Sequence, residues 1–296
     1  MLRMWTSTIL ALMACIVLAG CQSTSSTTSS SGGYPSVYYH QTWQASSSDG
    51  ESFSVTPSIY LYDHASVPGA VVYGGSIYLY FVDNEDYPTE RLSVVISADG
   101  GATWSAKQTV TFTGTETTQP VDPNPIVDDG LIRLSYLANF GGDTNSFNIA
   151  SATSSDGVNF TGVTILATGE GFVDPDLFNH NGTWNLFIHN GVTGTLLRYK
   201  SDISSSSGFS QVPTFNSVGG AISSTVSINS TYYTYFAAGG NICRATFDGD
   251  SLSTVNTSLI DMSQATSNVG VIADPTIILS PSGDYRLYYK FQPSGV

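Results

Sequence analysis

Three aspartates occupy the same place in a repeated pattern, and each is followed directly by proline. They are Asp122, Asp174 and Asp274. Carboxyl groups that converge on one pocket repel one another, which raises their pKa values into the range that general acid–base chemistry uses. An Asp-Pro pair can also cap the turn at the entrance of a strand. The pattern predicts a carboxylate cluster, with turn capping as the alternative role for one or two of its members.

The elements that must position these aspartates are β-strands. Runs rich in β-branched and aromatic residues, such as 76–82, 131–136 and 231–236, follow turn pairs such as Gly74-Gly75. This alternation is typical of antiparallel hairpins. No convincing amphipathic helix is found after residue 34. Residues 34–296 are therefore expected to form one large all-β domain.

A unit made of an apolar strand, a hairpin turn and a Tyr-rich strand recurs about every fifty residues. Such a period in an all-strand chain is typical of propeller blades with four strands each. The fifth unit ends after about two strands, and residues 37–53 can supply the missing ones. The sequence predicts a five-bladed β-propeller whose last blade is closed by N-terminal strands. A six-bladed ring and a β-sandwich are the alternatives. The unit openings are at 66–72, 121–127, 173–178, 221–226 and 273–278.

A second marker concerns the turns. Ser97-Ala98-Asp99-Gly100-Gly101-Ala102-Thr103-Trp104 resembles the Asp-box of sialidases and related propellers, and residues 154–160 are a weaker copy. The Asp-box staples a hairpin, so it indicates fold and not chemistry. The resemblance to sialidases implies arginines that bind the substrate. Arg198 and Arg244 are candidates on third strands, although no third arginine stands in that register.

The repeat also resembles the family 43 glycoside hydrolases, which include arabinanases, β-xylosidases and arabinofuranosidases. Its sharpest match is Val173-Asp174-Pro175-Asp176-Leu177-Phe178, continued by Gly182-Thr183-Trp184-Asn185-Leu186-Phe187. The resemblance implies that Asp174 tunes the pKa of the catalytic acid and orients the substrate. Asp122 and Asp274 are the further catalytic candidates.

The chain departs from that family at two positions. Where the family has its catalytic base, blade one has Ser66, so Asp63 is a candidate if its loop folds inward, with His64 beside it as a candidate substrate-binding residue. Where the family has its acid glutamate, residues 219–224 contain no acidic group. Glu170 and Glu116 are spare candidates on the same rim.

Two functions follow from these features. The first is a glycoside hydrolase acting on a polysaccharide or oligosaccharide through carboxylates at the channel mouth. The alternative is a non-catalytic carbohydrate-binding propeller that has lost the acid glutamate. The net charge of −14, with only nine Lys plus Arg, argues against a nucleic-acid partner. No cofactor is expected. Converging carboxylates could hold a cation, but no metal-ligand spacing is visible.

The N-terminus carries an export signal. A short apolar run ends in Leu18-Ala19-Gly20-Cys21, which resembles the lipobox of bacterial lipoproteins. The resemblance implies a signal peptide at 1–20, lipidation of Cys21 and anchoring in a membrane. Gln22 favours the outer membrane, which places the protein in the cell envelope, periplasmic or surface-facing. Residues 21–33 are rich in Ser and Thr and are expected to form a flexible tether of about 20 Å.

Overall fold

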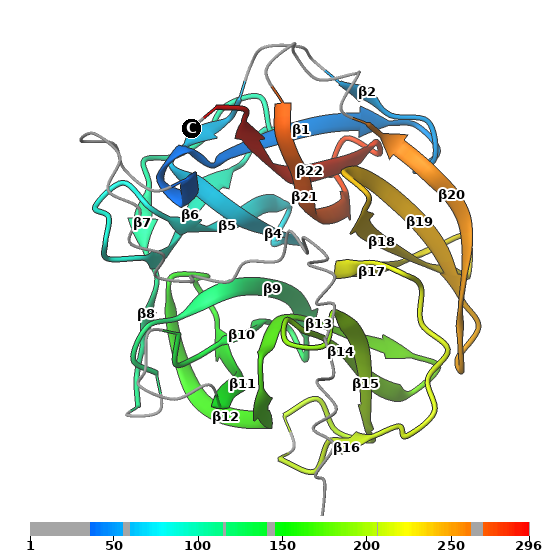
Figure 1. The fold of residues 1–296 in the computed structure, drawn as a ribbon. Coiled ribbons are helices and arrows are strands. Elements are labelled where there is room, and N and C mark those ends of the chain that lie inside the picture. The colour runs from blue at the N-terminus through cyan, green and yellow to red at the C-terminus, as the bar shows by residue number, and fades with distance from the viewer. Residues whose placement is uncertain are drawn as a thin grey trace, which may run out of the picture.

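The structure is a computed structural model that describes residues 36–55, 60–114, 117–140, 146–205, 207–261 and 269–295. Within these ranges one short 3-10 helix, η1 (Ser36–Tyr39), precedes the strands. The strands form five sheets arranged around a central axis (Figure 1). The predicted five-bladed all-β propeller is therefore confirmed. No helix in the described part of the chain is long and apolar enough to span a membrane.

Each blade has four antiparallel strands, counted here from the axis outward. Blade one contains β4 (Ala65–Tyr73), β5 (Ser76–Asp83), β6 (Arg91–Ser97) and β7 (Gln108–Thr109). Blade two contains β9 (Val121–Asp128), β10 (Leu131–Leu137), β11 (Ser146–Ser154) and β12 (Asn159–Glu170), with β8 (Thr111–Phe112) parallel to β12. Blade three contains β13 (Phe172–His180), β14 (Thr183–Asn190), β15 (Thr195–Ser201) and β16 (Ser210–Gln211). Blade four contains β17 (Ala221–Ile228), β18 (Thr231–Ala238), β19 (Asn241–Phe247) and β20 (Leu252–Ile260).

Blade five joins the two ends of the chain. It contains β21 (Val269–Leu279), β22 (Tyr285–Pro293), β1 (Gln41–Ser47) and β2 (Ser54–Val55), and β3 (Tyr62–Asp63) also pairs with β1. β1 pairs antiparallel with β22 along its whole length, and Trp43 stacks on Phe291 with ring centroids 4.5 Å apart. The ring is closed by N-terminal strands, as predicted, and this closure removes two sheet edges.

Every innermost strand carries the same β-bulge near its start. The bulged residues Val67, Asp122, Asp174 and Asp274 have φ between +46° and +55°, and the ladder with the second strand shifts register at each of them. In blade one the equivalent of the aspartates is therefore Val67, one residue beyond Ser66. In blade four the shift falls at Ile222. Neither position carries a carboxyl group.

In blades two to five, the residue two positions after the bulge has a polar side chain that links neighbouring blades. It accepts a hydrogen bond from a backbone N–H of the next blade, so these bonds cross four of the five blade interfaces around the axis. The acceptors are Asn124 (from Leu177, 2.9 Å), Asp176 (from Thr225, 3.2 Å), Ser224 (from Ile277, 3.4 Å) and Thr276 (from Ala70, 3.1 Å). Blade one has Gly69 here, and a β-carbon at Gly69 would lie 2.1 Å from the carbonyl oxygen of Pro123. Only glycine allows this close approach.

The turns between third and fourth strands lie at the opposite end of the propeller from the bulges. In these turns an aspartate carboxylate accepts backbone N–H groups two to four residues ahead, as at Asp49, Asp99, Asp156 and Asp248. At Asp99 the Thr103 hydroxyl also donates to the carboxylate and is the largest cause of its lowered pKa. These hydrogen bonds stabilise the charged form and hold the pKa of both Asp49 and Asp99 at about 2.

Candidate functional site

The five innermost strands run in the same direction, so their bulges meet at one end of the channel. Asp122, Asp174 and Asp274 line one cavity there, together with prolines 123, 175 and 275. The enclosed space between these residues is only about 20 Å³, room for about one water molecule, so a larger ligand would bind at the mouth and not inside it. The structure therefore brings together the three predicted aspartates. This end of the molecule is called the carboxylate end below.

Asp122 and Asp174 are directly linked. The backbone N–H of Asp174 donates a hydrogen bond to Oδ2 of Asp122 at 3.3 Å. Burial, and then the charge of Asp174, raise the pKa of Asp122 well above its usual range. Asp122 therefore retains a proton under conditions in which an exposed aspartate would have lost it.

Asp174 has a histidine beside it. Nδ1 of His189 lies 3.8 Å from Oδ2 of Asp174, and both side chains are buried. The contact follows from the sheet, because Val173, just before the bulge, pairs with His189 on β14. A protonated His189 would stabilise the Asp174 carboxylate, and a neutral one can orient it.

Asp274 is held by a lysine. Nζ of Lys290, on the neighbouring strand β22, lies 2.5 Å from Oδ2 of Asp274, and both side chains are almost fully buried. Burial raises the pKa of Asp274, and the positive charge of Lys290 opposes this shift. Asp274 is therefore less available for proton transfer than Asp122.

A second buried group adjoins this pair. His40 contacts the Ser66 hydroxyl at 2.9 Å through Nδ1 and Oε1 of Gln292 at 3.1 Å through Nε2. Burial, and then the nearby charge of Lys290, lower the pKa of His40 to about 3. His40 is thus neutral at physiological pH, and Ser66 serves as its partner.

A glutamate that the sequence analysis did not single out also belongs to this end. Glu90 is the last residue of the loop between β5 and β6, and its charge is one of the causes that raise the pKa of Asp122. Burial raises the pKa of Glu90 itself to about 7. No motif surrounds Glu90. One signal could have identified it. Because successive strands of a blade alternate in direction, the loop between the second and third strands lies at the same end as the Asp-Pro pairs.

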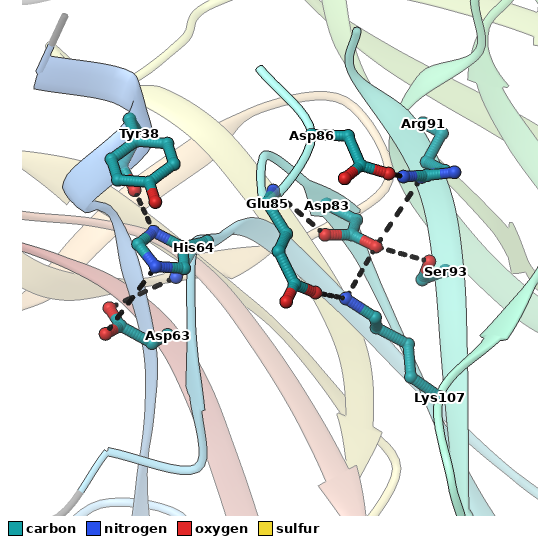
Figure 2. Close-up of polar contacts among 9 residues, drawn as sticks. All are labelled: Tyr38, Asp63, His64, Asp83, Glu85, Asp86, Arg91, Ser93 and Lys107. Carbon is teal, nitrogen blue, oxygen red and sulfur yellow. Dashed lines mark hydrogen bonds and ion pairs between the residues drawn. The ribbon is translucent and has the colours of Figure 1, made fainter. Parts of the chain in front are cut away.

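The loop that carries Glu90 is fixed by a charged cluster, which Figure 2 shows around Asp83. The buried Asp83 carboxylate contacts Nζ of Lys107 at 2.9 Å and the hydroxyl of Ser93 at 3.0 Å. Lys107 also contacts Glu85 at 2.5 Å, and Arg91 contacts Asp86. Both ends of the loop are therefore anchored.

Asp63 and His64 lie on the segment before blade one, at the left of Figure 2. Asp63 is exposed and accepts a hydrogen bond from Nε2 of Gln41 at 3.2 Å. His64 bonds the carbonyl oxygen of Tyr38, and the two rings lie 4.0 Å apart. Neither residue lines the carboxylate cavity.

The remaining candidates are spread over the molecule. Glu170 ends β12 at the carboxylate end and is exposed. Arg198 and Arg244 do lie on third strands, β15 and β19, but they point to turns of the next blade, where they bond the carbonyl oxygens of Gly249 (2.7 Å) and Gly50 (3.1 Å). Such contacts stabilise the blade interfaces. Glu116 and Cys21 lie outside the described residues.

A metal centre finds no support in the described ranges. Nowhere in them do three His, Cys, Asp or Glu side chains converge closely enough to hold an ion.

Comparison with known proteins places the fold. No protein-family model matches the chain, and a search of curated proteins found no match. Among solved structures, the GH43_1 enzyme from Xanthomonas citri is similar with a TM-score of 0.56 and 16% identity, over 77% of this chain and 87% of that one. An endo-1,4-β-xylanase from Bacteroides thetaiotaomicron gives a TM-score of 0.58 and 16% identity, over 78% and 86%.

A third similar structure is the catalytic domain of a GH62 α-L-arabinofuranosidase from Coprinopsis cinerea, with a TM-score of 0.53, 11% identity and coverage of 77% and 90%. The Xanthomonas citri enzyme has also been solved with xylose and with xylotriose. The fold is thus the five-bladed propeller of these glycoside hydrolases.

Proposed function

We propose that this protein is a glycoside hydrolase that acts on an oligosaccharide or polysaccharide at the carboxylate end of its channel. The observation that carries the proposal is the convergence of Asp122, Asp174 and Asp274 on one cavity, with Asp122 linked to Asp174. Glycoside hydrolysis needs one carboxyl group that gives a proton and one that assists the attacking water. The fold shared with an endo-1,4-β-xylanase and an α-L-arabinofuranosidase supports a sugar substrate.

A second function is favoured by Val67 and Ile222. They stand at the bulge positions of blades one and four, where a catalytic carboxyl group would be expected by the family resemblance. A propeller without these groups could bind a sugar and leave it intact. Non-catalytic carbohydrate recognition is therefore the alternative.

The proposal includes an anchor. Cys21 would carry lipid and hold the propeller at the outer membrane, with residues 21–33 as the tether. Helix η1, which follows this region in the chain, lies at the carboxylate end, where Asn84 donates a hydrogen bond to the carbonyl oxygen of Val37 at 3.2 Å. The tether would then leave from the same end as the site.

The test is hydrolysis of a panel of polysaccharides and aryl glycosides by purified residues 34–296, compared with Asp174→Asn and with Asp202→Asn as a matched control. Asp202 is exposed and follows β15 at the opposite end. Hydrolysis that is lost in Asp174→Asn but kept in the control supports an enzyme. Saturable binding of one glycan without hydrolysis supports the alternative. If the protein shows neither hydrolysis nor saturable binding, both functions are refuted.

A further inference from the structure

Glu90 is placed by the packing of blade one against blade two. Strands β5 and β6 pack against β9, and Leu92 of β6 belongs to the same buried cluster as Val121 of β9. Glu90 comes directly before β6 and two residues before Leu92, so it stands at the carboxylate end of the interface between blades one and two. Asp122 follows Val121, and the two carboxyl groups interact electrostatically.

The acidic residues around Glu90 are paired, and Glu90 is not. Arg91, on the other face of β6, binds Asp86, while Lys107 binds Asp83 and Glu85. Within the described residues the Glu90 carboxyl group makes no hydrogen bond and no ion pair, and burial is the cause of its shifted pKa. Glu90 is also part-exposed. It is therefore a half-buried carboxyl group, electrostatically coupled to Asp122, that has no structural partner among the described residues.

We propose that Glu90 is the proton donor of the site and supplies from blade one the acid that blade four lacks. This inference rests on the proposed glycoside hydrolysis. As the bond between the anomeric carbon and the leaving oxygen breaks, the Glu90 carboxyl proton moves to that oxygen. A water molecule adds to the anomeric carbon and gives its proton to the Asp174 carboxylate. Solvent then returns a proton to Glu90 and removes one from Asp174.

The other acidic groups fit this role less well. Asp274 is bound to Lys290, and Asp122 accepts a backbone hydrogen bond inside the channel. A pKa of about 7 leaves Glu90 protonated in a large share of molecules at neutral pH while keeping it acidic enough to donate. Asp83, Lys107 and Arg91, shown in Figure 2, make ion pairs that fix the loop that ends at Glu90.

The experiment compares Glu90→Gln with Asp202→Asn, a matched carboxylate-to-amide change at an exposed position at the opposite end of the propeller. The substrates are two aryl glycosides of the sugar that wild type hydrolyses, one with a dinitrophenol and one with a poor leaving group. Glu90→Gln is expected to lose about 100-fold or more in kcat on the poor leaving group, but less than about 10-fold on dinitrophenol, which needs little protonation. Wild-type activity should fall as pH rises through about 7, and this decline should vanish in Glu90→Gln.

Two results would overturn the assignment while leaving the enzyme intact. One is full activity of Glu90→Gln, and the other is an equal loss on both substrates with an unchanged pH profile, which would indicate a structural role. Failure of wild type to hydrolyse any glycoside would instead refute the proposed function, and the donor role with it. Because wild type is measured first, the two failures are told apart.

Discussion

Replacing Lys290 by methionine would leave the buried Asp274 without its charge partner. The two groups lie 2.5 Å apart, and the two residues are only 5% and 1% exposed. Removing one member of a buried ion pair typically costs about 3–5 kcal/mol, because the remaining charge stays desolvated. For a domain of this size the expected fall in Tm is roughly 6–20 °C. Methionine retains most of the packing volume, so the loss reports mainly on charge.

The assay is urea and thermal unfolding of Lys290→Met at pH 5 and pH 8. Without Lys290 the pKa of Asp274 rises further, so the folded state holds its proton more tightly than the unfolded chain. Stability is then retained at low pH and lost as pH rises, and the penalty should be larger at pH 8. Lys200→Met, at an exposed position of β15, is the control. A loss no larger than that of Lys200→Met, or one independent of pH, would refute this reasoning.

Three further predictions concern the channel and its surroundings. Gly69→Ala should destabilise the protein by about 3 kcal/mol or more, because the new β-carbon meets the Pro123 carbonyl oxygen; Gly219→Ala, in open space, is the control, and equal unfolding midpoints would contradict the expectation. Asp122→Asn should stabilise the protein at pH 8 by at least about 1 kcal/mol and have little effect at pH 4, because the raised pKa of Asp122 makes its charged form unfavourable in the folded state. Urea unfolding at both pH values tests this, and a lower free energy of unfolding at pH 8 would contradict it. Because the pKa of His40 is about 3 in the folded protein, the free energy of unfolding should fall by about 1.4 kcal/mol per pH unit below 6.5, where the unfolded chain takes up a proton on His40. His40→Gln should lack this dependence, and stability–pH curves of equal slope for the two proteins would contradict the prediction.

The fold could be predicted from sequence because a propeller repeats local information. The strands and turns of each blade come from a stretch of about fifty residues, so the period, the Asp-Pro pairs and the missing half-blade could all be recognised in the sequence. The placement of Ser66 at the blade-one aspartate position was off by one residue. Polar character pointed to Ser66, whereas the register shift of β4 puts Val67 at the bulge.

What sequence could not predict is the contacts between blades. Lys290 and Asp274 meet because β21 pairs with β22 and has a bulge next to Ala273, the residue that pairs with Lys290. The spacing of the two residues in the sequence does not predict an ion pair. Glu90 approaches Asp122 across a blade interface. The sequence makes Arg198 a candidate substrate-binding residue, but in the structure its guanidinium group donates to the carbonyl oxygen of Gly249. Such assignments depend on side-chain direction, which the repeat does not encode.

The central claim is that a sugar binds at the carboxylate end. Diffraction from crystals of Asp174→Asn, soaked with the oligosaccharide that wild type hydrolyses or binds, tests it most directly. We expect a sugar ring at the channel mouth, in contact with Asp122 and within reach of Glu90. A sugar located only at the opposite end of the channel, or on an outer blade surface, would contradict it.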